Sequence, residues 1–462
     1  MLIPTAGLTQ GKPRVFLPGF PFLLLWLLAA LLLGWTTSGR SAEVKPEAAA
    51  SQAVLKSPAN FDDCVRLALR QSPFFTKSSL EIEVRKLDEA DSKSELFPSL
   101  YFVSRYYPSQ PNNPDVTDPL NYYVAFTTGD YNPLVAYLSL KAKKLITQIA
   151  RLAHQKAMSK GIEHLGKSFL ELSAVERMAK LQATYVELAQ ENLRSARERQ
   201  KLGQVVPMEV EIISQEAAVA KAQQEALQAS QARIREGISK FLDLKPDQPL
   251  RLDLTEVRRQ VLGDFDPARA SLEEARNRDF DVRIKQLSQE LQTWNVTLAK
   301  MKFVPSFNLV VQTPDPVSSN INRGTFFSLG LNFPIFEGFK RLRNINRQKK
   351  ILQQFASEET VKGTELLQKW REVESDLRTA ATELQVARAQ ADLARLKERQ
   401  AETFYRTGEM EFSAFMKARR ERVEAELEVI RKALEHDTAA LELRSLSGEL
   451  VDRYINEARF SS

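Results

Sequence analysis

The chain has 462 residues, a net charge of +6, 43% hydrophobic residues and 27% charged residues. This composition is typical of a folded protein, and a single cysteine with three scattered histidines excludes a disulfide framework and a cysteine- or histidine-rich metal site. Acidic residues nearly balance the basic ones beyond the N-terminal segment, which argues against nucleic acid as a partner.

The first 42 residues have the pattern of a secretory signal peptide. Lys12 and Arg14 precede an apolar run that ends at Trp35, and small residues follow up to Ala42. The run is shorter than the roughly 20 apolar residues of a transmembrane helix, so we expect cleavage rather than a permanent anchor. Residues 43–60, rich in Ala, Ser, Pro and Lys, are predicted to be a flexible lead-in.

Two long intervals without proline predict two helical hairpins. No proline occurs between Pro133 and Pro207, or after Pro334. Because proline in a helix interior costs about 3 kcal/mol, and because both intervals are rich in good helix formers, each can be a very long helix. Gly203 and Gly408 are the predicted turns, since glycine readily takes the left-handed conformation that ends a helix. The outgoing arms then hold about 70 residues each, or roughly 100 Å.

The chain contains an internal duplication. Landmarks such as Ala68 and Ala275, Pro98 and Pro305, and the two turn glycines recur about 205 residues apart. The predicted organisation is a first repeat at residues 61–245, a linker at 246–267, a second repeat at 268–450 and a C-terminal tail at 451–462.

Each repeat also holds a pair of short strand-like segments before its hairpin. Residues 306–333 alternate apolar and polar side chains with the period of a half-buried strand, and residues 99–128 are less regular but rich in aromatic residues. Four such strands are too few to close a wide barrel, so several chains would have to share one. The alternative is a soluble sandwich packed on the helices.

Together these motifs resemble the TolC family of outer-membrane efflux proteins over about residues 60–450. The resemblance rests on the repeated Pro-Ser pairs after each opening helix (Pro98-Ser99 and Pro305-Ser306), the junction Asn332 to Gly338, and the glycine turns. It implies a mostly α fold with a small β part, in which a homotrimer shares a 12-stranded transmembrane β-barrel and long coiled-coil hairpins extend into the periplasm.

The function implied by the resemblance is that of an outer-membrane duct in a tripartite efflux pump or type I secretion system. The implied partners are a periplasmic adaptor protein, an inner-membrane transporter and outer-membrane lipid, with no nucleic acid, metal or cofactor. The alternatives are an enzyme, against which the absence of phosphate-loop, dinucleotide, zincin and nucleophile-elbow motifs argues, and a periplasmic or membrane-tethered coiled-coil adaptor without a pore. The adaptor alternative does not explain the strand pairs.

The resemblance also implies that the two turns form a gated periplasmic tip. The candidate residues are Gly203, Glu209, Tyr405, Gly408, Met410 and Lys417. Met410 stands where the family often has arginine, and Lys417 where drug exporters often have an acid. We hypothesise that the Tyr405 hydroxyl donates to Glu209 and helps hold the resting tip shut; the simpler alternative is that Glu209 caps its helix and Tyr405 packs.

A basic cluster follows the last strand directly. It comprises Lys340, Arg341, Arg343, Arg347, Lys349 and Lys350. Its position suggests either phospholipid headgroups at the inner leaflet or a solvated helix face.

Overall fold

The computed structural model describes residues 58–106, 122–245, 250–313, 326–333, 335 and 337–458. The predicted signal peptide, residues 43–57 of the lead-in, the loop within each strand pair, the first residues of the linker, Pro334, Phe336 and the last four residues lie outside this part. All described residues belong to one compact unit, Leu55–Ser462. No helix among them is long and apolar enough to cross a membrane.

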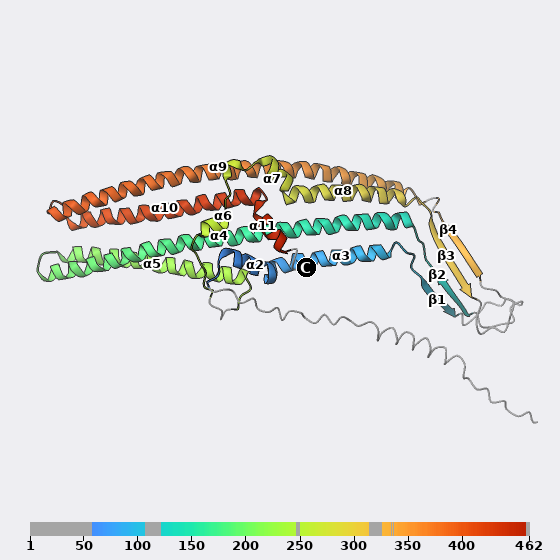
Figure 1. Ribbon diagram of the computed structural model, residues 1–462, viewed down its shortest axis with the longest axis horizontal. Helices are drawn as coiled ribbons and strands as arrows, with labels where there is room; N and C mark the ends of the chain where they lie inside the picture. Colours follow the sequence, from blue (N-terminus) through green and yellow to red (C-terminus); the bar gives the residue numbers. More distant parts are fainter. Residues whose placement is uncertain are drawn as a thin grey trace, which may run out of the picture. The chain divides into compact units, whose positions relative to one another are not determined.

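The elements follow each other in two similar series (Figure 1). The first is α2 (Phe61–Gln71), α3 (Pro73–Ser94), β1 (Tyr101–Tyr106), β2 (Tyr122–Thr127), α4 (Pro133–Lys201) and α5 (Pro207–Phe241). The second is α6 (Val257–Leu262), η1 (Pro267–Arg269), α7 (Leu272–Arg278), α8 (Phe280–Met301), β3 (Ser306–Thr313), β4 (Phe326–Asn332), α9 (Lys340–Thr407), α10 (Phe412–Leu446) and α11 (Glu449–Ala458). The predicted fold class, with duplicated long hairpins and four strands, is confirmed.

The long helices start where local signals allow and continue because nothing interrupts them. Asn132 caps α4 by accepting from the Leu134 and Val135 N–H groups, and Pro133 occupies the first helical position. α4 has 69 residues and α9 has 68, so each is roughly 100 Å long at 1.5 Å per residue. Within α9, Leu377, Leu384 and Ala391 recur on one buried face.

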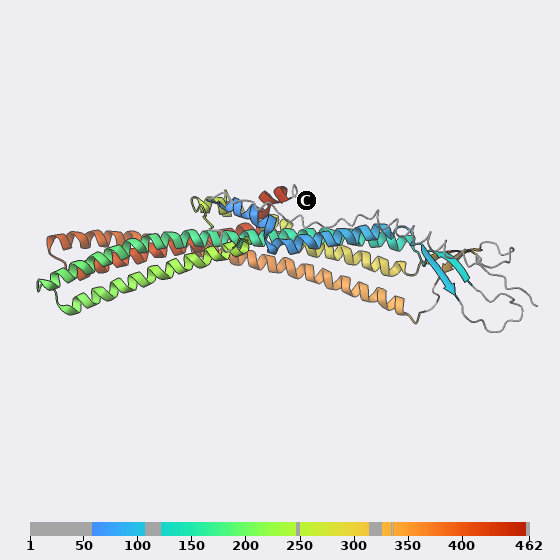
Figure 2. The same cartoon turned by 90° about the horizontal axis from the view of Figure 1, so that it is seen from below.

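α4 and α9 run through the whole helical part and change neighbours along the way (Figures 1 and 2). Next to the strands the packing order is α3, α4, α8, α9; towards the turns it is α5, α4, α10, α9. One edge of the described unit is therefore formed by α3 and α5, and the other edge by α9 alone.

The four strands form one antiparallel sheet in the order β1-β2-β3-β4. The β2–β3 pairing, with Val124 opposite Thr313, joins the two repeats, and β1 and β4 are the outer strands. On β4, Phe327, Leu329 and Leu331 alternate along the strand and are all exposed. An exposed apolar row of this kind needs a non-aqueous or protein neighbour.

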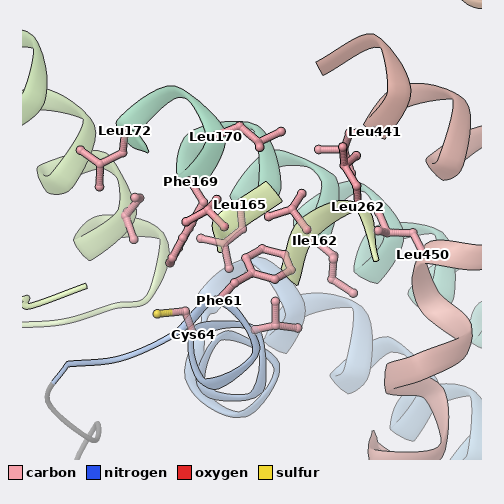
Figure 3. Packing of buried hydrophobic residues seen from close by; sticks show 14 of the residues in the cluster. Phe61, Cys64, Ile162, Leu165, Phe169, Leu170, Leu172, Leu262, Leu441 and Leu450 are labelled. Carbon is pink, nitrogen blue, oxygen red and sulfur yellow. The ribbon is translucent and has the colours of Figure 1, made fainter. Parts of the chain in front are cut away.

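The main hydrophobic core lies midway along the long helices, where the short helices pack on α4 and α10 (Figure 3). Phe61 of α2 meets Phe169 of α4 edge to face at 5.4 Å between ring centroids. Cys64 is fully buried there, and burial raises the pKa of its thiol to about 12.

Residues 451–458, predicted above as part of a C-terminal tail, belong instead to helix α11. Leu450, Val451 and Tyr454 are buried in the main core, and the Tyr454 hydroxyl donates to Asp62 of α2 at 2.6 Å. The segment is helical because its apolar residues recur at helical spacing, a signal that the lack of a nearby landmark concealed.

Candidate functional site at the hairpin ends

Both predicted turns are present and both use glycine in the left-handed conformation. Gly203 has φ of +71° and Gly408 has φ of +78°. At the first turn the Gln204 N–H donates to the Arg199 carbonyl at 2.9 Å; at the second the Glu409 N–H donates to the Phe404 carbonyl at 2.9 Å. These bonds satisfy carbonyl groups that the helix ends leave free, and a side chain at either glycine would strain the backbone.

The predicted polar candidates lie near these turns. Glu209 is half-buried in the first turn of α5, where the positive end of the helix dipole favours a carboxylate. The Met410 N–H donates to the Phe404 carbonyl at 3.2 Å, and Lys417 is exposed on α10.

Tyr405 is held by an aromatic cluster at the second turn. Its ring stacks on Phe415 at 5.2 Å with an interplanar angle of 5°, and contacts Phe412 at 5.5 Å. The Arg419 guanidinium lies over the same Phe415 ring, 5.0 Å from its centroid. Phe412, Phe415 and Arg419 were not among the predicted tip residues, although their spacings of three and four residues place them on one face of α10.

The structure does not bring Tyr405 and Glu209 together within one chain. In the part of the chain that is described, no hydrogen bond joins them, and α9 and α5 stand at opposite edges of the helical layer. The gating contact therefore stays a prediction.

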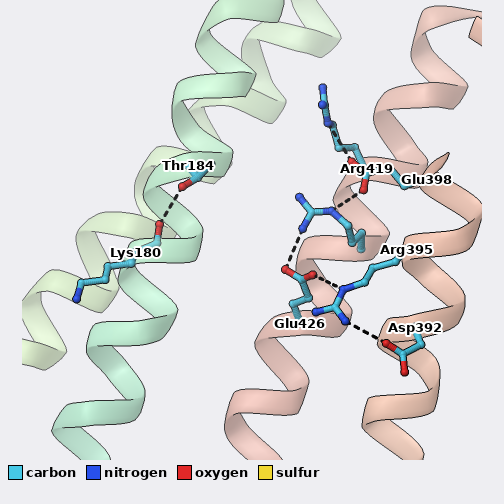
Figure 4. A network of polar contacts seen from close by, with 8 residues as sticks. Lys180, Thr184, Asp392, Arg395, Glu398, Arg419 and Glu426 are labelled. Carbon is cyan, nitrogen blue, oxygen red and sulfur yellow. Dashed lines mark hydrogen bonds and ion pairs between the residues drawn. The ribbon is translucent and has the colours of Figure 1, made fainter. Parts of the chain in front are cut away.

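A ladder of charged residues joins α9 to α10, farther from the second turn than the aromatic cluster (Figure 4). Glu398 accepts from Arg419 at 3.1 Å and pairs with Arg422 at 2.7 Å; Glu426 pairs with Arg422 and with Arg395, both at 2.9 Å. Glu398 and Glu426 are each only 16% exposed. Three of these pairs join α9 to α10, and the Arg422–Glu426 pair lies within α10.

A groove runs between α4, α5 and α10, close to the turns. It has a volume of about 670 Å³, and its apolar lining includes Ile212, Val219, Val423 and Leu427. Arg420 of α10 pairs with Glu216 of α5 at 3.4 Å, which joins the two hairpins across it. Burial, with Glu216 nearby, raises the pKa of Tyr185 in its wall.

Comparison with known proteins gives a family match for the second half of the chain. Residues 271–449 match the family model of the outer membrane efflux protein. No curated protein sequence matches closely enough to count as a relative.

The fold has several solved counterparts. The outer membrane channel CmeC of Campylobacter jejuni is 15% identical, with a TM-score of 0.71 over 86% of this chain and 89% of that one. The outer membrane protein VceC of Vibrio cholerae is 13% identical, with a TM-score of 0.69 over 84% of this chain and 96% of that one. A membrane protein from Pseudomonas aeruginosa is 15% identical, with a TM-score of 0.73 over 84% of this chain and 92% of that one. Part of the chain thus matches the outer membrane efflux protein family, and its duplicated hairpins and four-stranded sheet have the fold of these solved channels.

Proposed function

We propose that this protein is the outer-membrane channel of a tripartite efflux pump or type I secretion system. The observation that carries the proposal is the direct continuation of an apolar-faced sheet into helices of 69 and 68 residues, in a chain whose residues 271–449 match the outer membrane efflux protein family. At roughly 100 Å, such helices reach deep into the periplasm from a sheet in the outer membrane. A coiled-coil adaptor without a pore would have no use for the sheet.

The channel is a homotrimer in this proposal. Within the described sheet, β1 and β4 each have one unpaired edge, and an unpaired edge is a template for another strand. Three copies joined edge to edge supply twelve strands and close both the sheet and the helical layer. The protein conducts its substrate passively, without catalysis, cofactor or nucleic acid.

The hairpin ends are the proposed meeting point with a periplasmic adaptor and, through it, an inner-membrane transporter. The groove between α4, α5 and α10 offers apolar residues beside the Arg420–Glu216 pair. The Tyr405–Glu209 contact belongs to the same proposal as a contact between copies, because closing the ring brings α9 of one copy to α5 of the next.

The test is reconstitution of export and of the pore. Cells that lack their own outer-membrane channel should regain dye efflux when they are supplied with this chain, a periplasmic adaptor and an inner-membrane transporter. Cells with the adaptor and transporter alone should not. The purified protein in planar bilayers should give discrete conductance steps. Normal outer-membrane insertion without efflux or conductance would refute the channel function.

A further inference from the structure

The start of α9 carries a basic stripe. Lys340, Arg343, Arg347 and Lys350 follow one another at three- or four-residue spacing, which keeps them on one helix face, and all four are exposed. No acid occurs in α9 before Glu358, and none of the four forms an ion pair in the described part of the protein. We name these four residues the basic stripe.

The basic stripe faces away from the rest of the chain. α9 packs on α8 through other residues: Gln292 donates to Gln348 at 2.7 Å, and Lys285 pairs with Glu358 at 2.7 Å. Because α9 forms one edge of the helical layer, no other described element covers the stripe.

The opposite edge of the layer has a complementary surface at the same level. On α3, Leu80, Val84, Leu87 and Asp91 follow one another at helical spacing, Glu95 at the C-cap continues the row, and all five are exposed. The other face of α3 packs on α4, as the Asp88–Lys143 pair at 3.6 Å shows. Neither Asp91 nor Glu95 forms an ion pair with any described residue.

The internal duplication indicates which helix packs on the α9 edge and on the α3 edge of the helical layer. Inside the chain, α4 of the first repeat packs on α8 of the second, with Lys141 4.7 Å from the Trp294 ring centroid and Lys156 2.5 Å from Asp281. α9 is the counterpart of α4, and α3 is the counterpart of α8. The quasi-equivalent of the α4–α8 contact is therefore α9 of one copy against α3 of the next.

The α4–α8 contact also indicates how α9 and α3 of neighbouring copies align along their axes. Lys141 lies about two turns after the start of α4, and Trp294 about two turns before the end of α8. The helices run in opposite directions, so residues equally far from the strand end stand side by side. Arg343 lies about one turn after the start of α9, and Asp91 about one turn before the end of α3.

We propose that the basic stripe is the docking surface for α3 of a second copy, with Asp91 of the next copy placed between Lys340 and Arg343. Glu95 of the next copy lies beside Lys340, and the aliphatic stems of Arg347 and Lys350 cover Leu87 and Val84 of the next copy. The inference rests on the trimer of the proposed function and adds its surface, polarity and register. The contact joins two different faces, so it repeats head to tail and closes a ring.

The experiment is a charge exchange in the full-length protein purified from outer membranes. Asp91→Lys alone and the Lys340→Glu/Arg343→Glu variant alone should each lower the temperature at which the trimer dissociates, because like charges then face each other in every seam. The triple variant should recover most of the loss. The matched control is Lys350→Glu combined with Asp91→Lys, which lies about two turns out of register and should give no recovery.

The outcomes separate the possibilities. Recovery in the triple variant but not in the control supports the proposal. The register is overturned, and the channel function left intact, if neither Asp91→Lys nor Lys340→Glu/Arg343→Glu lowers the dissociation temperature of the trimer. Recovery in the control as well as in the triple variant has the same meaning. Loss of co-purified phospholipid in the Lys340→Glu/Arg343→Glu variant, with no effect of Asp91→Lys, assigns the stripe to lipid headgroups and also overturns it. Absence of any trimer in the unmodified protein would instead refute the proposed function.

Discussion

Replacing Glu398 by Gln should loosen the α9–α10 pair more than any surface charge change in α9. Glu398 is 16% exposed and is shared by Arg419 at 3.1 Å and Arg422 at 2.7 Å. Removing one partner of a fully buried pair costs about 3–5 kcal/mol because the other charge is left uncompensated. Here the two arginines are 28% and 23% exposed, so solvent screens part of that penalty, and we expect a loss of about 1–2 kcal/mol.

The assay is backbone hydrogen exchange over residues 370–426 in detergent, which reports the local opening free energy around each substitution rather than global unfolding. The matched control is Glu374→Gln in the same helix. Its partner Arg378 is 79% exposed, so the expected loss is at most about 0.5 kcal/mol. Equal protection in the two variants would refute the reasoning that the ladder, rather than the apolar seam, holds the hairpin near its turn.

Four further predictions concern single residues. Burial lowers the pKa of His154, whose Nδ1 lies 2.7 Å from the Ser78 hydroxyl. The neutral ring therefore supports the fold above the pKa that His154 has in the unfolded chain, and this support is lost as the pH falls. His154→Gln should lessen the drop in melting temperature on acidification towards pH 5. Burial raises the pKa of Asp279, which caps α8 by accepting from the Val282 N–H at 2.8 Å. The protonated carboxyl therefore supports the fold below the pKa that Asp279 has in the unfolded chain, and this support is lost as the pH rises. The Asp279→Asn variant should melt at a higher temperature at pH 7.5, and a gain that persists at pH 3 would contradict desolvation of the carboxylate as the cause. Cys64 should resist maleimide in the native protein and react after unfolding, as followed by mass spectrometry. Tyr405→Phe should raise closed-state conductance in planar bilayers if its hydroxyl holds the tip, while unchanged conductance would leave the ring stacking on Phe415 as its role.

Proline and glycine positions were enough to predict the hairpins. The reason is local: Pro133, Pro207 and the two turn glycines act on their own backbone, whatever packs around them. The strands followed from alternation, because period two is also a local property. The family resemblance supplied the function that these elements alone do not specify.

The parts that the sequence did not reveal depend on contacts between distant segments. The apolar spacing of α11 is a local signal, but its packing on α2, where Tyr454 donates to Asp62, joins segments from nearly opposite ends of the chain. Likewise, the spacing of Glu398 and Arg422 in the sequence is that of ordinary helix-surface charges, and they pair only because α10 packs back along α9. The spacing of Phe412, Phe415 and Arg419 indicated a shared face but not that Tyr405 would stack on it.

The two returning helices, α5 and α10, have the same length, 35 residues each. Equal arms bring both turns to one level. Inserting seven residues into one arm would move its turn by about 10 Å, and would leave the opposite arm of the hairpin too short to match. A change of length that keeps both turns at one level therefore needs four compensating insertions or deletions, one in each arm of each hairpin, whereas a substitution at an exposed position leaves the lengths unchanged.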